Sequence, residues 1–397
     1  MTAPPSILVT VAGQDAPGIA ARVFEGLSTA GLPVADVEQV QVHGHLLLCV
    51  EVEGEGDRAE DLRRAVVGAL GVAGTGLVVT AVPLREVGRP TAETQLVTVL
   101  APDLPSGVLG SIFGRVASAG GNVERIARLS RFPVVSYELE VSGADAAGLR
   151  RGLAEEAARS RVDVAVQRTG LHRRAKHLIV LDVDSTLLQG EVIDLLAART
   201  GHAEEVAAVT AAAMAGEIDF ADALHRRVGL LGGLDESVLA EVRCQLTLAP
   251  GARTLVRTLR RLGYVTAIVS GGFVQVIDEL ADDLGIDHVA ANQLEVVDGR
   301  LTGRLVGPVI DRAGKAAALV DFARRAGVPL GRTIAVGDGA NDLDMLAVAG
   351  LGIAFNAKPV VRDAADTSLS VPYLDAILFL LGISREEVEA ADREDAD

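Results

Sequence analysis

The arrangement of apolar and polar positions repeats once in the first part of the chain. The apolar run Leu8–Val11 recurs as Leu96–Val99, 88 positions later. After each run come an Asp-x-Pro turn, a glycine, and apolar residues at the three- and four-residue spacing of a half-buried helix. Two further strands, a second helix and a closing strand complete each copy. The repeat therefore predicts two tandem domains, each with the element order βαββαβ of a ferredoxin-like fold.

This repeated pattern resembles the ACT domain family of small-molecule sensors over nearly all of residues 6–168. We assign residues 1–86 to the first copy and 87–168 to the second. The resemblance implies an amino-acid effector site near the strand-to-helix loops, at Asp15, Gly18, Asp103 and Gly107. The alternative is that these are turn and cap residues, since Asp, Pro and Gly are the usual turn formers. Because Ser106 is inserted before the second glycine, equal ligand binding by both copies does not follow from the pattern.

The rest of the chain follows a different pattern. From residue 178 to 384, short β-branched runs alternate with helical patterns, which is typical of an α/β domain with a parallel sheet. Between about residues 190 and 250 the pattern is helical and rich in alanine, which predicts an inserted cap. Residues 169–177 are basic and polar and predict a linker, and the charged residues 385–397 predict a tail that frays or stays disordered.

The amino-acid composition indicates which classes of molecule the protein is expected to bind and in which compartment it is expected to lie. The chain has 37 Lys and Arg against 54 Asp and Glu, a formal charge of −17, which disfavours nucleic acid and anionic membranes. Cys49 and Cys244 are far apart and lack metal-ligand spacing, so we expect a reducing cytoplasm. No signal peptide is apparent, and the longest apolar stretches are far shorter than the roughly 18–20 residues needed to span a bilayer.

Two carboxylates directly follow the first strand of the α/β region. Asp182 and Asp184 stand two positions apart after an apolar run, so in an extended segment their side chains share one face. Two such close negative charges raise the pKa of one carboxyl group unless a cation lies between them. The pair therefore suits a division of roles between a nucleophile and a general acid. Taken alone, it can also be a polar turn.

Three further polar motifs follow later strands or begin helices. Ser270 and Gly271 can direct a hydroxyl and an unhindered N–H at a phosphate oxygen. Lys315 taken alone reads as a solvated surface group. Asp338, Asn341 and Asp342 follow another strand among small residues, and hard carboxylate oxygens suit Mg²⁺.

Together the four motifs, in this order, resemble the haloacid dehalogenase superfamily. The resemblance implies a Rossmann-like α/β/α core with a helical cap, placed after the two βαββαβ domains. It implies that Asp182 forms an aspartyl phosphate and that Asp184 acts as general acid and base. It also implies Mg²⁺ held by Asp182, the main-chain carbonyl of Asp184 and Asp338, with Asp342 orienting its water shell. Phosphate charge is then stabilised by Lys315, Ser270 and Gly271, and Asn341 contacts the substrate or the Lys315 region.

The match extends into the cap and resembles the phosphoserine phosphatase family in particular. That likeness implies that Glu191 holds the substrate ammonium group and Arg227 its carboxylate, and a planar guanidinium suits bidentate carboxylate binding. The alternatives are that Glu191 is a helix N-terminal acid and that Arg226 is the true carboxylate ligand. The implied reaction is hydrolysis of O-phospho-L-serine to L-serine and phosphate, the last step of serine biosynthesis.

Two other functions stay open from the sequence. One is a phosphatase of another small amino-acid phosphate, and the other is a regulatory amino-acid-binding protein with a weak phosphatase domain. The intact catalytic motifs argue against the second. We expect serine or another amino acid as effector, and we expect a homodimer because ferredoxin-like sheet edges often pair between chains.

Overall fold

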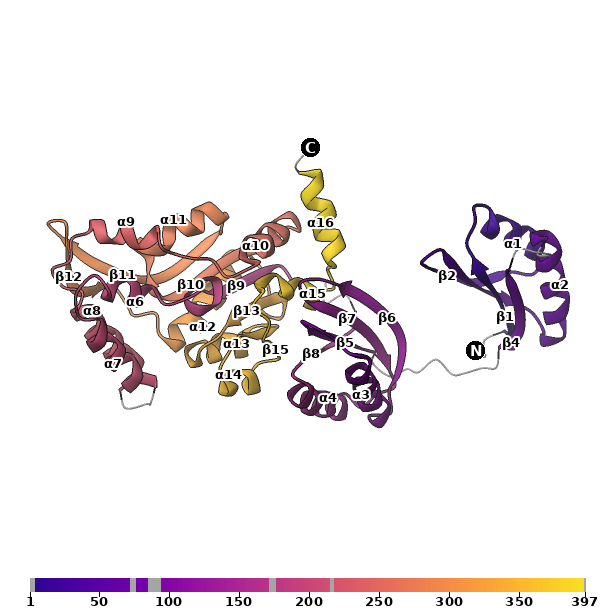
Figure 1. The fold of residues 1–397 in the computed structure, drawn as a ribbon, viewed down its shortest axis with the longest axis horizontal. Helices are drawn as coiled ribbons and strands as arrows, with labels where there is room; N and C mark the ends of the chain where they lie inside the picture. Colours follow the sequence, from indigo (N-terminus) through magenta and orange to yellow (C-terminus); the bar gives the residue numbers. More distant parts are fainter. Residues whose placement is uncertain (1–3, 72–75, 85–93, 171–175, 215–217, 396–397) are drawn as a thin grey trace. The chain divides into compact units, whose positions relative to one another are not determined.

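The computed structural model describes residues 4–71, 76–84, 94–170, 176–214 and 218–395 (Figure 1). The chain divides into two units, Met1–Thr91 and Ala92–Asp397. The predicted boundary between residues 86 and 87, residues 171–175 of the predicted linker and residues 396–397 of the predicted tail lie outside the described residues. No helix in the described part of the chain is both long and apolar enough to cross a membrane.

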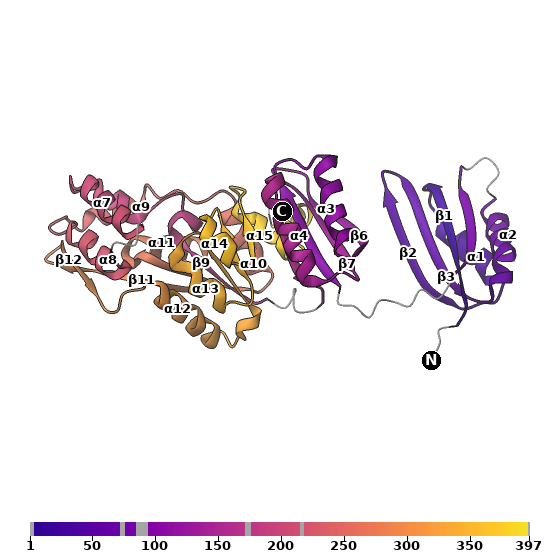
Figure 2. The same cartoon turned by 90° about the horizontal axis from the view of Figure 1, so that it is seen from below.

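The first unit has the predicted order βαββαβ, and its sheet runs β2-β3-β1-β4 with antiparallel pairs. Alternate residues of β1, such as Ile7, Val9 and Val11, are fully buried in a core with α1 and α2, as period-two patterning requires. Those helices cover one face of the sheet (Figure 2). The elements are β1 (Ser6–Gln14), α1 (Ile19–Ser28), β2 (Val34–Val42), β3 (His45–Glu53), α2 (Ala59–Leu70) and β4 (Val78–Leu84).

The other face of this sheet carries exposed apolar side chains. Val40 on β2 is paired with Leu47 on β3, and the two side chains are 53% and 44% exposed. Val82 on β4 is paired with Leu8 on β1 and is 48% exposed. The first copy therefore has a core on the helical side of its sheet only.

The second copy has the same element order and the same strand order, β6-β7-β5-β8. Its helical side again encloses a core, which includes Val97, Val99 and Leu139. Both copies confirm the predicted ferredoxin-like fold. The elements are β5 (Gln95–Ala101), α3 (Ser106–Ser118), β6 (Asn122–Ser130), β7 (Val135–Ser142), α4 (Ala146–Ser160) and β8 (Asp163–Arg168).

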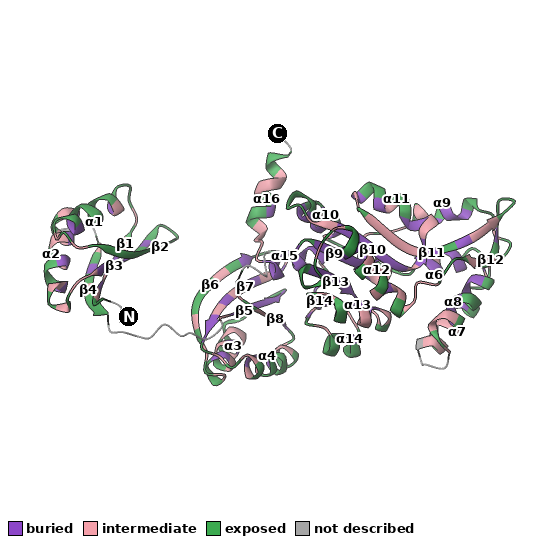
Figure 3. Cartoon of the chain, turned by 180° about the vertical axis from the view of Figure 1, so that it is seen from behind, coloured by how far each residue is buried: buried purple, intermediate pink, exposed green. Residues whose placement is uncertain are grey.

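The α/β domain contains a seven-stranded sheet in the order β12-β11-β10-β9-β13-β14-β15. Only β12 runs antiparallel to its neighbour, and the central strands are buried on both faces (Figure 3). This confirms the Rossmann-like core. The strands are β9 (Leu178–Asp182), β10 (Val265–Phe273), β11 (His288–Val297), β12 (Arg300–Val306), β13 (Thr333–Gly337), β14 (Gly352–Phe355) and β15 (Thr367–Leu369).

Helices flank this sheet and also form the insert after β9. The flanking helices are α10 (Ala252–Arg261), α11 (Val274–Leu284), α12 (Arg312–Arg325), α13 (Leu343–Val348), α14 (Pro359–Ala364) and α15 (Ile377–Leu380). The helices of the insert are α6 (Val192–Ala197), α7 (Ala203–Met214), α8 (Phe220–Gly229) and α9 (Ser237–Arg243). Where the chain enters and leaves the insert, Leu188 and Leu248 pair as an antiparallel bridge. The helical cap predicted for residues 190–250 is thus tied at its base to the core.

The second copy packs directly on the α/β domain. Leu100, Leu129 and Ala165 belong to the same hydrophobic core as β9, α10 and α15. At the junction of β8 and β15, the Asp163 carboxylate accepts hydrogen bonds from the Ser370 hydroxyl and, at 2.7 Å, from the Ser370 N–H. The Gln167 side chain donates to the Leu380 carbonyl at 2.9 Å. Apolar contact and hydrogen bonds therefore join these two domains into one unit.

The charged C-terminal segment is not the frayed tail that its composition predicts. It forms α16 (Arg385–Glu394), which begins with a capping box between Ser384 and Glu387. Arg261 on α10 forms ion pairs with Asp392 and Asp395, so part of the high charge is matched across helices. The prediction of a frayed or disordered tail was wrong because composition alone does not show these partners.

Candidate active site

Asp182 is the last residue of β9, at the carboxyl end of a fully buried strand. Its side chain is 3% exposed. Burial and the neighbouring Asp342 carboxylate raise the pKa of Asp182 well above its usual value, and Lys315 opposes this rise. The turn that follows holds Ser185 in the left-handed region at φ 58°, a conformation that costs free energy in a residue other than glycine. The chain thus reverses direction just beyond the two carboxylates.

Lys315 lies in the first turn of α12 and is not the surface group that a lone lysine suggests. Its side chain is 1% exposed, and its Nζ donates to Asp182 Oδ1 at 2.6 Å and to Asp342 Oδ1 at 2.7 Å. Burial lowers the pKa of the Lys315 ammonium, but the two carboxylates outweigh burial and raise it above its usual value. The lysine therefore stays charged and orients the Asp182 carboxylate.

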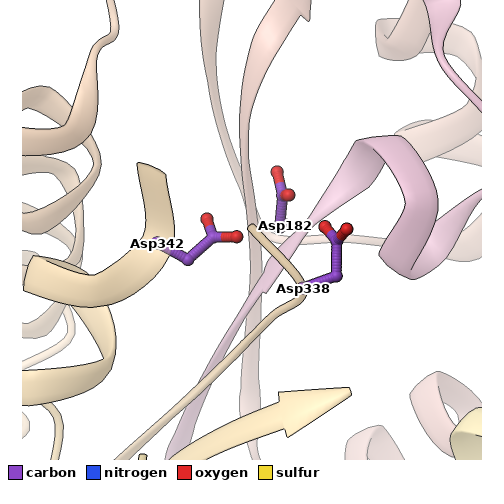
Figure 4. A group of neighbouring side chains, drawn as sticks. All are labelled: Asp182, Asp338 and Asp342. Carbon is purple, nitrogen blue, oxygen red and sulfur yellow. The ribbon is translucent and has the colours of Figure 1, made fainter. Parts of the chain in front are cut away.

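Asp182, Asp338 and Asp342 direct their carboxylates toward one another (Figure 4), and one oxygen of each lies within 4.8 Å of the others. Burial, Asp342 and Glu191 together raise the pKa of Asp338 to about 6. Asp342 is fully buried and also accepts a hydrogen bond from the Gly339 N–H at 3.0 Å. Crowded hard oxygen ligands of this kind fit a divalent cation such as Mg²⁺. The oxygens of Asp342 are already bonded to Lys315 and Gly339, which supports an outer role for this residue.

Asp184 is held by two hydrogen bonds. Its Oδ1 accepts from the Val192 N–H at 2.8 Å, and its Oδ2 accepts from the Ser270 hydroxyl at 3.1 Å. Burial and the nearby Glu191 raise the pKa of Asp184 to about 6. A carboxyl group with this pKa can hold or release a proton near neutral pH, as a general acid and base must.

Ser270 thus contacts the carboxyl group of Asp184, and its hydroxyl also accepts from the Gly272 N–H at 2.7 Å. It is fully buried and is not among the residues that line the cavity, whereas Gly271 is. That Ser270 binds phosphate stays a prediction.

One cavity of about 580 Å³ brings most of the predicted residues together. Its walls include Asp182, Asp184, Lys315, Asp338 and Asn341 from the core, and Glu191 and Arg227 from the start and the interior of the insert. Asp342 and Ser270 lie behind this lining and contact it through Lys315 and Asp184.

Arg227 on α8 is 9% exposed and lines the cavity, whereas the neighbouring Arg226 is exposed and does not. Burial lowers the pKa of the Arg227 guanidinium, and Glu191, Asp194 and Asp184 partly offset this effect. Glu191 accepts a hydrogen bond from the Ser185 hydroxyl at 3.0 Å and caps no backbone N–H of α6. Arg227 and Glu191 thus share the cavity, which Arg226 does not line, while Glu191 also stands at the N-terminus of α6. That the two residues bind the substrate carboxylate and ammonium groups stays a prediction.

Several lining residues have no counterpart in the sequence predictions. Thr210 on α7 accepts a hydrogen bond from Arg227 Nη1 at 3.4 Å, and Phe220 on α8 lies over Gly271. Arg312, Lys358 and Val360 line the same cavity from α12 and from the start of α14. Arg312 stands three residues before Lys315, a spacing at which residues of a helix are neighbours. That spacing is the local feature of the sequence that could have indicated that Arg312 lies near the active site.

The predicted effector residues lie outside this cavity. Gly18 precedes α1 at φ 91°, whereas Gly107 lies inside the first turn of α3 because Ser106 begins that helix. Asp15 accepts a hydrogen bond from the Gln41 side chain at 2.7 Å, and Asp103 is exposed. The two loops therefore differ in conformation, and effector binding at either stays a prediction.

Comparison with known proteins agrees with this arrangement. Residues 179–347 match the family of haloacid dehalogenase-like hydrolases, and residues 6–71 and 93–167 each match an ACT domain. A haloacid dehalogenase family hydrolase from Salmonella enterica serovar Typhi superposes with a TM-score of 0.64 at 28% identity, over 72% of this chain and 98% of that one. Fold and site together therefore define a haloacid dehalogenase-like hydrolase with two N-terminal ACT domains.

Relatives that match the chain over its full length narrow the assignment to one family of these hydrolases. The chain is 53% identical to a phosphoserine phosphatase of Streptomyces coelicolor, over 98% of this chain and 95% of the relative. It is 50% identical to a phosphoserine phosphatase of Mycobacterium tuberculosis, over 100% of this chain and 97% of the relative. The structure of a probable phosphoserine phosphatase from Vibrio cholerae superposes with a TM-score of 0.60 at 33% identity, over 74% of this chain and 88% of that one. The chain belongs to the phosphoserine phosphatase family.

Proposed function

We propose that this chain hydrolyses O-phospho-L-serine to L-serine and inorganic phosphate through an aspartyl phosphate on Asp182. The observation that carries the proposal is the set of charges in one cavity, which is lined by Arg227 and Glu191 as well as by the catalytic carboxylates and Lys315. An amino-acid phosphate needs a cation for its carboxylate, an anion for its ammonium group and a separate site for its phosphoryl group. The lining offers all three.

In the first step the Asp182 carboxylate attacks phosphorus, and the bond from phosphorus to the serine oxygen breaks. Lys315 holds Asp182 in place through its 2.6 Å hydrogen bond and adds positive charge beside the phosphoryl oxygens. Asp184 gives its proton to the departing serine oxygen, which is otherwise a poor leaving group. The products of this step are the aspartyl phosphate and L-serine.

In the second step water attacks the aspartyl phosphate. Asp184, now ionised, accepts a proton from that water, and the Asp182 carboxylate is regenerated as phosphate leaves. The hydrogen bonds from Val192 and Ser270 keep Asp184 oriented in both steps.

We propose Mg²⁺ as the metal, held by Asp182, the main-chain carbonyl of Asp184 and Asp338, with Asp342 in the outer shell. When bound, the ion supplies the positive charge that offsets repulsion between the carboxylate nucleophile and the phosphoryl group. A cytoplasmic location, a homodimer and regulation by serine or another amino acid at the ACT domains complete the proposal.

The test is phosphate release from phosphoserine with Mg²⁺ for the wild type, Asp182→Asn, Arg227→Ala and the control Arg226→Ala. We expect Asp182→Asn to lose at least about a thousandfold in kcat, or about 4 kcal/mol. Arg227→Ala should lose roughly 30-fold or more in kcat/KM for phosphoserine, about 2 kcal/mol, and little for an aryl phosphate. Arg226→Ala should match the wild type because Arg226 is exposed outside the cavity.

The outcomes separate the parts of the proposal. A wild type that cleaves the aryl phosphate but not phosphoserine would overturn the substrate and leave the hydrolase class standing. An active Asp182→Asn variant would overturn the nucleophile. Equal losses in Arg226→Ala and Arg227→Ala would overturn the carboxylate site.

A further inference from the structure

A second cavity, of about 590 Å³, lies where the second ACT domain meets the α/β domain. We call it the junction cavity. One of its walls comes from α4 and β8, and the other from α14 and β15. Of these elements, β8 and β15 lie side by side (Figure 1). Its volume is within the range of roughly 300–1,000 Å³ that is typical of small-molecule sites.

The basic and acidic side chains that line the junction cavity differ in how many of them already have hydrogen-bond or ion-pair partners. Arg150, Arg161 and Arg362 contribute guanidinium groups, and none of the three has a side-chain hydrogen bond or ion pair to any residue that the structure describes. The acidic residues of the lining are already used in part. Asp163 accepts two hydrogen bonds from Ser370, and Asp366 accepts one from the Gly352 N–H at 2.8 Å. The third acidic residue, Asp363, has no side-chain hydrogen bond or ion pair to a described residue. Three guanidinium groups and one carboxylate are thus left to meet a ligand, and this surplus of positive charge favours an anionic one.

A buried threonine and an aliphatic wall lie beside the arginines. Thr367 on β15 lines the junction cavity and is only 6% exposed, yet its Oγ1 has no hydrogen-bond partner among the described residues. Oγ1 is itself closed off from solvent, so a ligand in the cavity does not reach it in this structure. The wall beside it is aliphatic, with Leu153, Val164 and Val166. The cavity thus combines an apolar wall with a few unpaired polar groups.

One short helix connects this cavity to the catalytic one. Lys358 and Val360, at the start of α14, line the catalytic cavity, whereas Arg362 and Asp363 near its end line the junction cavity. The Lys358 N–H also donates to the main-chain carbonyl of Asp338 at 3.4 Å. A shift of α14 therefore reaches the carboxylate cluster directly.

We propose that the junction cavity binds a small oxyanion, the carboxylate or phosphate group of a metabolite, through Arg150, Arg161 and Arg362. We further propose that its occupancy changes the catalytic rate through α14. This site differs from the strand-to-helix loops of the ACT domains, because Asp103 and Gly107 are not among its lining residues and the α/β domain supplies one of its walls. Only the rate readout rests on the proposed function.

The binding test measures amide hydrogen exchange of the full-length protein with Mg²⁺, without ligand and with inorganic phosphate or L-serine. Amides of α4 and β8 do not report on the catalytic cavity, because neither element lines it. Binding at the strand-to-helix loop of the same domain is separated from binding in the junction cavity by the variants described next. At ten times its dissociation constant, a ligand should slow those amides by up to about tenfold. If only inorganic phosphate slows these amides, the site recognises a phosphate group. If only L-serine slows them, it recognises a carboxylate.

Two variants make this test specific. The double variant Arg150→Gln with Arg362→Gln should lose the slowing in α4 and β8. The control is Arg151→Gln, which changes an equally exposed arginine of α4 outside the cavity lining and should keep the slowing. Slowing with neither probe, or equal slowing in the double variant, would overturn the site.

Coupling is tested by kcat at saturating phosphoserine, where competition in the catalytic cavity is removed. We expect the effective probe to change kcat at least about twofold in the wild type and in Arg151→Gln, but not in the double variant. A site that binds the probe without changing kcat would overturn the coupling through α14. Amide exchange needs no turnover, so a chain inactive on phosphoserine would count against the proposed function and leave the site testable.

Discussion

The two ACT domains share one fold but differ in what covers the second face of the sheet. In the first domain, Val40, Leu47 and Val82 on that face are about half exposed. In the second, Leu100 and Ala165 lie on the corresponding face and are buried in the core of the α/β domain. Both domains therefore have a core on the helical side of the sheet, but only the second also shares a core with the catalytic domain on the other side. A change in the second domain can alter the catalytic domain by direct contact.

The largest expected effect comes from truncation. Removing residues 1–91 should leave the thermal midpoint of the remainder unchanged within a few degrees, because those residues form a separate unit. Removing residues 1–168 uncovers the apolar side chains that Leu100 and Leu129 contact, and we expect the midpoint to fall by about 10 °C or more. Differential scanning calorimetry of both truncated chains measures this, and equal midpoints would show that the shared core adds no stability.

A single substitution on the second face of each sheet should show the same difference between the two ACT domains. Leu100→Ala removes a fully buried side chain and should lower the free energy of unfolding by about 2–5 kcal/mol. The control Leu47→Ala changes a side chain that is 44% exposed on the open face of the first domain and should cost at most about 0.5 kcal/mol. Urea denaturation measures both, and similar losses would mean that the open face of the first domain is covered in solution.

The hydrogen bonds at the sheet junction should contribute less. Asp163→Ala leaves the Ser370 N–H and hydroxyl without their acceptor, and we expect a loss of about 1–3 kcal/mol. Burial raises the pKa of Asp163, so ionising this group opposes folding, and removing its charge offsets part of the loss. The control Asp145→Ala removes the N-cap of α4 away from the junction and should cost about 1 kcal/mol. If Asp163→Ala stabilises the protein, the cost of burying the charge exceeds the value of its hydrogen bonds.

The smallest expected effect compares two equivalent threonines. Thr98, on β5, is fully buried and its hydroxyl has no hydrogen-bond partner among the described residues, whereas Thr10, at the same position of the repeat, is half-buried. Thr98→Val should therefore stabilise the protein by about 1 kcal/mol, and Thr10→Val should change it by less than about 0.5 kcal/mol. A destabilising Thr98→Val would show that a bound water or another group satisfies this hydroxyl.

The sequence was sufficient for the fold class, and most of the residues it predicts for the active site line one cavity. Strand and helix periodicities are set by neighbours along the chain, and parallel strands bring their carboxyl ends to one edge of the sheet. Asp182 and Asp338 each lie at the carboxyl end of a strand and could be grouped for this reason, whereas Lys315, in the first turn of α12, was added only by the resemblance to the haloacid dehalogenase superfamily. Only the structure shows that Arg227 lines the cavity and that Arg226 is exposed outside it, and carboxylate binding by Arg227 stays a prediction.

Other features depended on contacts between residues far apart in the chain. Ser270 has the residue type and position of a phosphate ligand, yet its hydroxyl contacts Asp184, 86 positions away. The charged tail is a helix because Arg261 lies opposite Asp392. Thr210 and Lys358 reach the catalytic cavity from helices whose orientation no local pattern gives.

The sequence by itself determined two copies of one sensor fold, a Rossmann-like domain and the order of its catalytic motifs, because these follow from periodicity and from motif spacing. It could not distinguish the two copies by their surroundings, since both have the same alternation of apolar and polar residues. Only the tertiary structure decided that the second copy shares its core with the catalytic domain and that a cavity lined by arginines lies at their junction. The reason is that burial on the second face of a sheet depends on which distant side chains pack against it.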